Sequence, residues 1–362
     1  MSSDAGKRGS REARAEQDWT GLSSGGQHAI AAPAQLEAVA PTSLRLVCFG
    51  GGTGLPTVLR GLCRTTGNAR HLPSITAIVA MSDDGGSSGR LRRSRGSLPP
   101  GDVRRCLIAL GRGNRELSRV FQYRFSGKSG LAGHAVGNLV ITAMAELKGS
   151  FLEAVKASAE MLGVQGTVLP CTLSPVDLIA YKADDTCVVG ERNIARLPGR
   201  VLKVHLHPKA PQPADCVLDA IEAADLICIG PGSLYSSVLP NLLVDGVVGA
   251  LKRARAIKVL IANLMTQPGE TDGMDCADHV KAIIEHVGPA IDAVLVNTAP
   301  LPAEALERYA RRSSFPVSFD RRAVLKIGVI PVEADLLRDG PRIRHDGRKV
   351  ARQLMKVARS GL

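Results

Sequence analysis

A glycine-rich segment at residues 50–54, Gly-Gly-Gly-Thr-Gly, separates an apolar stretch from a stretch with helical spacing. The apolar stretch, 44–49, has the composition of a strand, and the segment after the glycines repeats apolar residues every three or four positions. Glycines let a phosphate approach the backbone, and the first turn of a helix offers free N–H groups and the positive end of its dipole. The sequence therefore predicts a phosphate-binding turn formed by Gly51, Gly52, Thr53 and Gly54.

Two common nucleotide-binding fingerprints do not fit this turn. The dinucleotide pattern G-x-G-x-x-G would need a glycine in place of Leu55 or Thr57, although the related spacing G-x-G-x-G is met at 50, 52 and 54. A Walker A loop would need Gly-Lys-Ser or Gly-Lys-Thr to follow, and neither does. An NAD-dependent dehydrogenase is therefore disfavoured, and the turn alone leaves the nucleotide open.

Short apolar segments alternate with helical segments along most of the chain, which predicts a three-layer, Rossmann-like α/β fold with a mostly parallel sheet and helices on both faces. Strands are expected at 44–49, 75–81, 225–229, 258–264, 293–297 and 327–331. An insertion of helices and short strands is expected over about 112–210, with antiparallel strands from 167 to 208. Residues 1–42, which are rich in Ser, Gly, Ala and charge, are predicted to be a disordered leader, so that 43–362 forms a single domain.

Polar segments follow the predicted strands, where ligands of open α/β sheets bind. The first of them contains Asp83 and Asp84, followed by Ser87 and Ser88. The two aspartates are the candidate catalytic groups and the candidate Mg²⁺ ligands, because Mg²⁺ prefers oxygen and shares its coordination with phosphates. A hydrogen bond to a ribose hydroxyl, or a simple pair of solvated turn residues, are the alternatives.

Later segments supply further candidates for binding the ligand. Asp102 suits helix capping as well as ligand contact, and Arg104 suits phosphate. A second glycine loop with several hydroxyl groups follows another apolar strand and is a second anion cradle. The amides and hydroxyls after the next strands suit a sugar or a base edge. These candidates are Asp102, Arg104, Asn138, Gly230, Gly232, Ser233, Tyr235, Asn263, Thr266 and Asn297.

The formal net charge of +12 favours a polyanionic partner. Nucleic-acid modules add a clustered basic run or a set of stacking aromatics, but here the basic residues come singly or in pairs and aromatics make up only 3% of the chain. A phosphate-rich small ligand is therefore predicted, and nucleic acid is not. The sequence has no secretory signal and no apolar run of about 18 residues, so we expect no membrane span and a cytoplasmic location. A homodimer is the default expectation for a soluble oligomer.

Taken together, the motifs resemble the bacterial gluconeogenesis factor family (YvcK-like), in the superfamily of 2-phospho-L-lactate transferase, CofD. The resemblance covers about residues 44–359, and the family's segments occur in the same order. They are FGGGTGL at 49–55, SDDGGSSGRLRR at 82–93, PPGD at 99–102, GHAVGN at 133–138, GPGSLYSSVLPNLL at 230–243 and NLMTQPGETDG at 263–273. Two departures are the long leader and Met81-Ser82, where the family commonly has Val-Ala.

The resemblance implies a cytoplasmic, Rossmann-like protein that binds UDP-sugars of the UDP-N-acetylglucosamine type and links carbon metabolism to cell-wall supply and cell shape. No reaction is established for that branch, and no cofactor is required by it. The glycine loops would meet phosphate, and Tyr309 and Arg344 would help to hold the uridine nucleotide. The alternative is the transferase branch, which moves a phospholactyl group from a nucleotide diphosphate onto the deazaflavin Fo, with Mg²⁺ and an aspartate loop.

Overall fold

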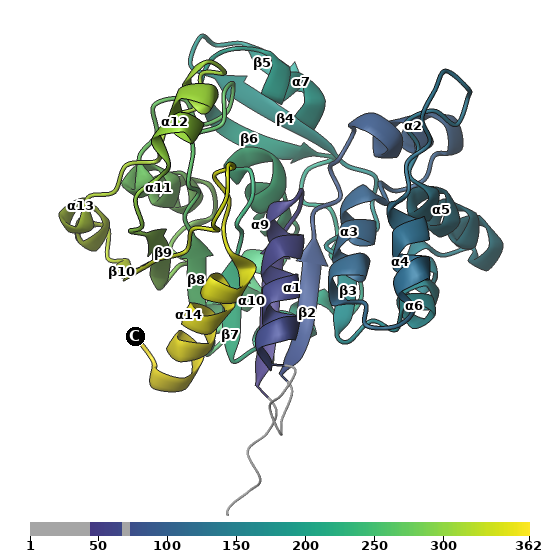
Figure 1. Cartoon of the computed structure of the whole chain (residues 1–362), viewed down its shortest axis with the longest axis horizontal. Helices are drawn as coiled ribbons and strands as arrows, with labels where there is room; N and C mark the ends of the chain where they lie inside the picture. The colour runs from purple at the N-terminus through teal and green to yellow at the C-terminus, as the bar shows by residue number, and fades with distance from the viewer. Residues whose placement is uncertain (1–43, 67–72) are drawn as a thin grey trace, which may run out of the picture. The chain divides into compact units, whose positions relative to one another are not determined.

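The computed structural model describes residues 44–66 and 73–362, and the leader expected at 1–42 lies outside that part of the chain. Seven strands form one sheet in which all neighbours are parallel, in the order β10-β9-β8-β7-β1-β2-β3 (Figure 1). The predicted α/β class is therefore confirmed. The strands are β1 (Arg45–Gly50), β2 (Ser74–Val79), β3 (Thr167–Pro170), β7 (Leu226–Ile229), β8 (Ile257–Ile261), β9 (Ala293–Asn297) and β10 (Ile330–Ala334).

Helices connect these strands in two groups, one on each side of β3 in the sequence. The first group is α1 (Gly54–Thr66), α2 (Gly86–Arg95), α3 (Gly101–Leu110), α4 (Arg115–Gln122), α5 (Val136–Lys148) and α6 (Phe151–Leu162). The second group is α7 (Glu191–Arg196), α8 (Val217–Glu222), the π-helical turn η1 (Leu234–Val238), α9 (Leu239–Leu242), α10 (Val247–Arg253), α11 (Cys276–Val287), α12 (Ala303–Ala310), α13 (Arg321–Lys326) and α14 (Gly347–Ser360).

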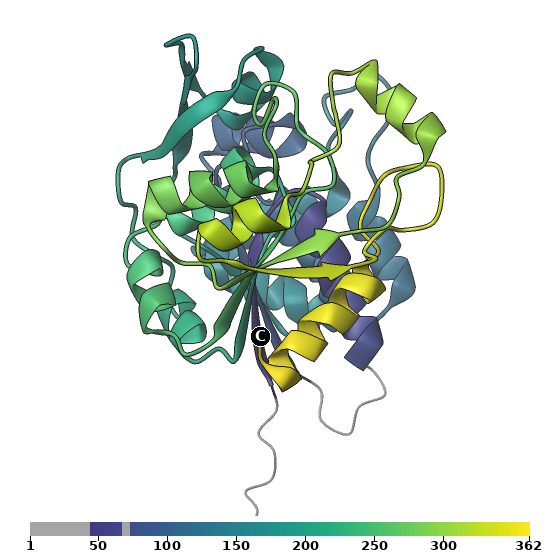
Figure 2. The same cartoon turned by 90° about the vertical axis from the view of Figure 1, so that its left-hand side faces the viewer.

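The strand order reverses between β1 and β7. From β1 the chain steps outward to β2 and β3, and from β7 it steps outward the other way to β8, β9 and β10. Because parallel crossovers are right-handed, steps in opposite directions place their helices on opposite faces of the sheet. Figure 2 shows α1 and α14 on one side and the green helices α10 and α11 on the other. The two central strands are consequently covered on both faces, as their nearly continuous apolar sequence requires.

A second, antiparallel sheet in the order β5-β4-β6 forms the insertion. Its strands are β4 (Asp177–Lys182), β5 (Cys187–Val189) and β6 (Val201–His207). The antiparallel part was expected to begin at Thr167, but residues 167–170 pair in parallel with β2 and belong to the main sheet. Their short apolar run fits either sheet, so the sequence alone does not decide which one they join.

The buried Lys182 side chain ties this small sheet to the rest of the domain. Its Nζ lies 2.5–3.2 Å from five backbone carbonyl oxygens. Four of these carbonyls belong to α7 and the turn after it, and the fifth belongs to Gly269 in the loop after β8. The ammonium group therefore links the insertion to a loop that begins at the carboxyl end of the main sheet.

Helices α1 and α14 contact each other backbone to backbone. A Cβ atom added at Gly61 would lie 1.8 Å from the carbonyl oxygen of Gly347, so no larger residue fits at this crossing. The last helix is capped by Asp346, whose side chain accepts hydrogen bonds from the N–H groups of Arg348 and Lys349 at 2.7 and 3.1 Å. The crossing brings the segment before α14 beside the first turn of α1.

Within the described ranges, no single helix is long and apolar enough to cross a membrane. The helices Leu234–Leu242 and Val247–Arg253 satisfy the length and composition criteria only as a pair, and they are bent by 74° at the break between them.

Candidate functional site

Two glycine loops meet at the point where the strand order reverses. One follows β1 and the other follows β7, and these strands are neighbours in the sheet. A Cβ atom added at Gly54 would lie 2.0 Å from the carbonyl oxygen of Pro231, so only glycine allows the loops to approach this closely. Open parallel sheets bind ligands at such reversal points, beyond the carboxyl ends of the strands.

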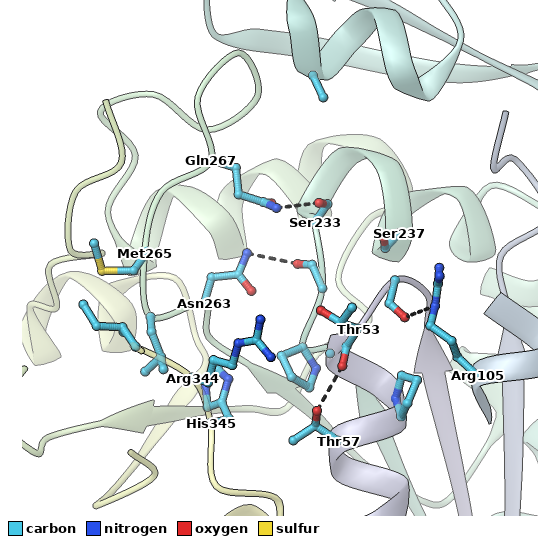
Figure 3. A pocket seen from close by; sticks show the side chains of 18 of the residues that line it. Thr53, Thr57, Arg105, Ser233, Ser237, Asn263, Met265, Gln267, Arg344 and His345 are labelled. Atoms are coloured by element: carbon cyan, nitrogen blue, oxygen red, sulfur yellow. Dashed lines mark hydrogen bonds between the residues drawn. The ribbon is translucent and has the colours of Figure 1, made fainter. Parts of the chain in front are cut away.

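The two loops present backbone N–H groups that the protein itself does not use. In the part of the chain that the structure describes, the N–H groups of Thr53, Gly54, Gly232 and Ser233 donate to no protein acceptor. The side chains of neighbouring residues hold the second loop in place: Asn263 Nδ2 donates to the Gly232 carbonyl at 3.0 Å, and Gln267 Nε2 donates to Ser233 Oγ at 2.6 Å (Figure 3). Free donors in two adjacent loops form a cradle suited to two linked anionic groups.

Asp102 supports the first loop from α3. Its Oδ2 accepts a hydrogen bond from the Gly52 N–H at 2.6 Å, and its Oδ1 forms an ion pair with Arg105. Arg105 Nε also donates to the Gly52 carbonyl at 2.9 Å. The capping role considered for Asp102 is not observed, since the N-cap of α3 is Pro100 and no side chain caps that helix. Asp102 is instead a buried anchor for the glycine loop.

A cavity of ≈ 1070 Å³ opens over the two loops. Residues from the β1 and β7 loops, α3, the segment after α4, α7, the loop after β8, α12 and the segment before α14 line it. Its volume is at the upper end of the range for small-molecule sites. Ten of the residues proposed from the sequence lie in the lining: Gly52, Thr53, Gly54, Arg104, Gly232, Ser233, Asn263, Thr266, Tyr309 and Arg344.

Other proposed residues lie behind the lining and support it. Asn138 Oδ1 accepts a hydrogen bond from Arg104 Nε at 2.7 Å, and Asn138 Nδ2 donates to Ser87 Oγ at 3.0 Å. Ser87 Oγ in turn lies 3.1 Å from His134 Nδ1. Gly51 allows Asp102 to approach, because a Cβ there would lie 2.6 Å from Asp102 Oδ2. These groups hold Arg104 and the first glycine loop in position.

The polar segment 82–89 was expected to be a loop, but its second half is helical. Ser87 and Ser88 are buried residues of α2, which begins at Gly86. The abundance of glycine and serine hid this helix from the sequence pattern, because both residue types are weak helix formers. The two serines therefore support the fold around the site rather than line the cavity.

Two more proposed residues have internal partners. Tyr235 is buried, with its hydroxyl 3.9 Å from Met274 Sδ, and burial raises the pKa of its phenol to about 12. Asn297 Nδ2 donates to the Ala299 carbonyl at 2.8 Å, and its Oδ1 accepts from the Leu336 N–H at 2.9 Å. Tyr235 is a buried residue of η1, and Asn297 joins β9 to the segment after β10. Neither lines the large cavity.

Asp83 and Asp84 also stand outside the lining of the large cavity. Asp83 Oδ1 accepts a hydrogen bond from the Gly85 N–H at 2.9 Å, and Asp84 Oδ1 accepts one from the Arg192 N–H at 2.9 Å. Across the described chain, no group of three or more His, Cys, Asp and Glu side chains is placed to hold a metal ion. Each aspartate keeps one oxygen for a further partner, so the donors suit Mg²⁺ only where ligand phosphates complete the coordination.

Several lining residues were not singled out from the sequence. Five of them are charged: Arg60, Arg105, Arg124, Glu191 and Arg312. They come from α1, α3, α7 and the segments after α4 and α12, so no short motif contains them. The overall positive charge was the only sequence signal for the arginines. Gln267 lies within the quoted segment 263–273, and its neighbours Asn263 and Thr266 were the residues chosen there.

The cavity is strongly basic. Its lining contains six arginines and one carboxylate, that of Glu191. Arg105 pairs with Asp102, and none of the other five lining arginines pairs with a carboxylate in the described parts of the chain. Burial and the charge of Arg124 lower the pKa of Arg104 to about 10. Burial, followed by the nearby charge of Asp83, raises the pKa of the half-buried Glu191 well above its usual value. The uncompensated positive charge favours an anionic ligand.

One end of the cavity is less polar. Met265, Tyr309 and Ile343 are lining residues that belong to, or pack against, a small apolar cluster apart from the main core. Tyr309 donates its hydroxyl to the Ile343 carbonyl at 3.3 Å, which fixes the position of its ring. His345 lies beside them, and burial lowers its pKa to about 4, so its ring is uncharged at neutral pH. Arg344 is a charged group at this end (Figure 3), and the lining residue Arg312, whose N–H donates to the Tyr309 carbonyl at 2.8 Å, is another.

Comparisons with known proteins agree with this architecture. The chain matches the family model described as "2-phospho-L-lactate transferase CofD" over residues 46–337. It is 42% identical over 314 residues to the gluconeogenesis factor of Halalkalibacterium halodurans, covering 86% of this chain and 95% of that protein. It is also 42% identical over 316 residues to the gluconeogenesis factor of Bacillus subtilis, covering 86% of this chain and 98% of that one.

A solved structure shows the same fold. The crystal structure of a member of the UPF0052 family from Bacillus halodurans superposes with a TM-score of 0.83 at 40% sequence identity. The match covers 87% of this chain and 100% of the other.

Proposed function

The chain belongs to the CofD family and is homologous to bacterial gluconeogenesis factors, and from this premise we propose that it binds a nucleotide-sugar of the UDP-N-acetylglucosamine type in the basic cavity. The bound ligand would let the protein link carbon metabolism to cell-wall supply and cell shape. The observation that carries the proposal is the pair of glycine loops in contact at Gly54 and Pro231, with unused N–H groups on both.

A diphosphate suits this cradle better than a single phosphate does. Thr53 and Gly54 offer donors from the first loop, and Gly232 and Ser233 offer donors from the second. The loops are in direct contact, so two phosphoryl groups joined by one bridging oxygen can each meet one loop. Hydrogen bonds from N–H groups to phosphate oxygens are charge-assisted, and the surrounding arginines neutralise the remaining charge.

The nucleoside would lie at the less polar end of the cavity. Tyr309, Met265 and Ile343 offer apolar surface for a base and ribose. Asn263 adjoins the phosphate cradle, since its Nδ2 donates to the Gly232 carbonyl. Arg344 would interact with a phosphate from the nucleoside side, since it lies on one side of Thr53 in Figure 3. The sugar would then extend past the cradle toward α3.

Isothermal titration calorimetry tests this proposal directly. We expect the folded protein to bind UDP-N-acetylglucosamine and UDP with micromolar affinity, and to bind N-acetylglucosamine alone too weakly to detect. NAD⁺ also carries a diphosphate, but it joins two nucleosides. Its affinity therefore shows whether the site recognises the diphosphate alone or the UDP-sugar as a whole. An absence of binding to UDP and UDP-N-acetylglucosamine at millimolar concentration, in protein shown to be folded by circular dichroism, would contradict the proposal.

A phospholactyl transferase is the second candidate, and the description of the matching family model favours it. In that case the free oxygens of Asp83 and Asp84, with the ligand phosphates, would hold Mg²⁺, which would neutralise charge on the transferred group. Incubation with Fo, a nucleotide diphosphate donor and Mg²⁺ should give a new phosphodiester that mass spectrometry detects. An unchanged Fo peak under conditions where the donor binds would exclude this candidate.

A further inference from the structure

The cavity extends beyond the phosphate cradle on the side away from Arg344. In Figure 3, Thr53 lies between Arg344 and Arg105. Three of the lining arginines, Arg104, Arg105 and Arg124, come from α3 and the segment just after α4. A diphosphate held by the glycine loops would be served by Arg105, because this side chain donates to the Gly52 carbonyl. Arg104 and Arg124 need a different explanation.

Arg104 is buried without a negative partner. It is 5% exposed, and its hydrogen bonds go to two uncharged acceptors, Asn138 Oδ1 at 2.7 Å and the Phe121 carbonyl at 3.2 Å. Among the described residues, no acceptor forms a hydrogen bond with its Nη2, and this nitrogen is not among the buried atoms that lack a partner. Burying a guanidinium without a carboxylate is costly, so a protein that retains one usually supplies it with an anion.

Arg124 brings a second positive charge to the same place. Its Nη1 donates to the Gly133 carbonyl, another uncharged acceptor. Its charge acts on Arg104, since it adds to burial in lowering the pKa of that residue. The close packing of Gly137 fixes the geometry: a Cβ there would lie 2.7 Å from Arg104 Cδ and 2.7 Å from Phe121 Cδ1. The protein thus holds two like charges near each other at one end of a ligand-sized cavity.

From this geometry we propose that Arg104 and Arg124 form a subsite for a carboxylate on the sugar end of the nucleotide-sugar. The inference rests on the proposed function, because it assumes that the diphosphate occupies the two glycine loops. A carboxylate can accept two parallel hydrogen bonds from a guanidinium, which a neutral hydroxymethyl group cannot do. Among UDP-sugars, one whose sugar carries a carboxylate should therefore bind more tightly than its neutral counterpart.

Two commercially available ligands test this subsite without any change to the protein. UDP-glucose and UDP-glucuronate differ only at C6, where a hydroxymethyl group is replaced by a carboxylate. We expect UDP-glucuronate to bind about tenfold more tightly than UDP-glucose, which corresponds to about 1.4 kcal/mol. Equal affinities for the two sugars would overturn the carboxylate subsite and leave the proposed function intact. If neither sugar nor UDP binds, the proposed function itself fails.

The substitution Arg124→Gln tests whether Arg124 causes the preference for UDP-glucuronate over UDP-glucose. Arg124 is exposed to solvent, so its replacement should leave the fold unchanged, which a thermal unfolding curve verifies. We expect the variant to bind UDP-glucuronate about tenfold more weakly and UDP-glucose within twofold of the unmodified protein. Arg115→Gln is the matched control, because Arg115 is an exposed residue of α4 outside the cavity. An equal loss of affinity for both sugars in Arg124→Gln would overturn the assignment, since Arg124 would then contact a group common to them.

Discussion

The Asp102 carboxylate holds the Gly52 N–H at 2.6 Å and connects the first glycine loop to α3. The same side chain pairs with Arg105, which returns to the Gly52 carbonyl, so both polar groups of one glycine are fixed by two residues of one helix. Because Asp102 and Arg105 bind only the polar groups of Gly52 in this loop, the N–H groups of Thr53 and Gly54 remain free for a ligand. The loop therefore has its shape before any ligand arrives, which reduces the entropy lost on binding.

Asp102→Ala should both destabilise the protein and weaken the binding of UDP. Removing the buried acceptor leaves the Gly52 N–H and the Arg105 side chain without their partner, which costs about 1–3 kcal/mol. Urea denaturation measures this loss, and Asp102→Asn serves as the intermediate case because it keeps one oxygen acceptor but loses the negative charge. If the alanine variant is as stable as the unmodified protein, Asp102 is not the anchor described here.

Gly54→Ala should disrupt the cradle more than its single methyl group suggests. The added Cβ would lie 2.0 Å from the Pro231 carbonyl oxygen, so the two loops must separate. We expect at least a tenfold loss of affinity for UDP in calorimetry, together with lower thermal stability. Gly130→Ala is the control, because a Cβ at Gly130 meets no atom within 4 Å. Retained affinity in Gly54→Ala would show that contact between the loops is not needed for binding.

Arg344→Gln should weaken the binding of UDP about tenfold, since it removes a positive charge from the nucleoside end of the cavity. The affinity of the variant should also depend less on ionic strength than that of the unmodified protein, because one screened charge interaction is lost. Arg342→Gln is the matched control: it makes the same change two residues away, at an exposed position outside the lining. Similar effects of the two substitutions would indicate a general effect of net charge rather than a contact at the site.

Lys182→Met should destabilise the protein by about 3 kcal/mol or more, because the carbonyl oxygens around Nζ lose a charged donor in a buried place. The small sheet and the loop at Gly269 should loosen together, and increased proteolysis in the turn 197–200 would report it. Lys203→Met, an exposed change on the neighbouring strand β6, provides the comparison. A variant with unchanged stability and unchanged proteolysis would disprove the linking role of Lys182.

The buried Glu270 should make stability depend on pH. Burial raises its pKa from 4.5 to about 7, while its carboxylate accepts a hydrogen bond from Ser236 Oγ at 3.1 Å. The folded state therefore retains a proton that the unfolded state releases. The stability that this proton provides is fully present below pH 4.5 and is lost as the pH rises to about 7, by an amount on the order of 3 kcal/mol.

The substitution Glu270→Gln separates this effect from other titrations. Glutamine resembles the protonated carboxyl group, so the variant should match the unmodified protein near pH 4.5 and be the more stable of the two at pH 8. Thermal unfolding at the two pH values measures the difference. Glu285→Gln, an exposed change on α11, should give no such divergence. A constant difference between Glu270→Gln and the unmodified protein at both pH values would contradict the assignment.

Much of the fold could be predicted because its strands carry strong local signals. Cys48 and Phe49 in β1, and Ile227 and Cys228 in β7, lie in short apolar runs that end in glycine, and a parallel sheet buried on both faces requires such runs. The assignment of residues 167–170 to the main sheet depends on pairing with β2, which no local pattern records. The helix at Ser87 and Ser88 forms against the propensity of its residues, because tertiary packing outweighs a weak local preference.

Part of the candidate site could likewise be predicted from the sequence, and part could not. The residues of the two glycine loops could be proposed from the sequence, because glycine spacing after a strand has a direct physical meaning. Arg60, Arg124 and Arg312 could not, since each arginine resembles any solvated surface arginine until the fold brings it to the cavity. Tyr235 lies within the motif 230–243 and Asn297 ends β9, but their side chains meet internal partners, which only the three-dimensional structure reveals.

The crossing of α1 and α14 at Gly61 and Gly347 has a consequence for the order in which the protein is made. The cavity lining begins at Gly52 and ends at His345, and that crossing sets the last lining segment beside the first. A ribosome producing this chain makes both glycine loops more than a hundred residues before Arg344. A chain that ended after β10 would therefore carry both glycine loops but lack Arg344 and His345.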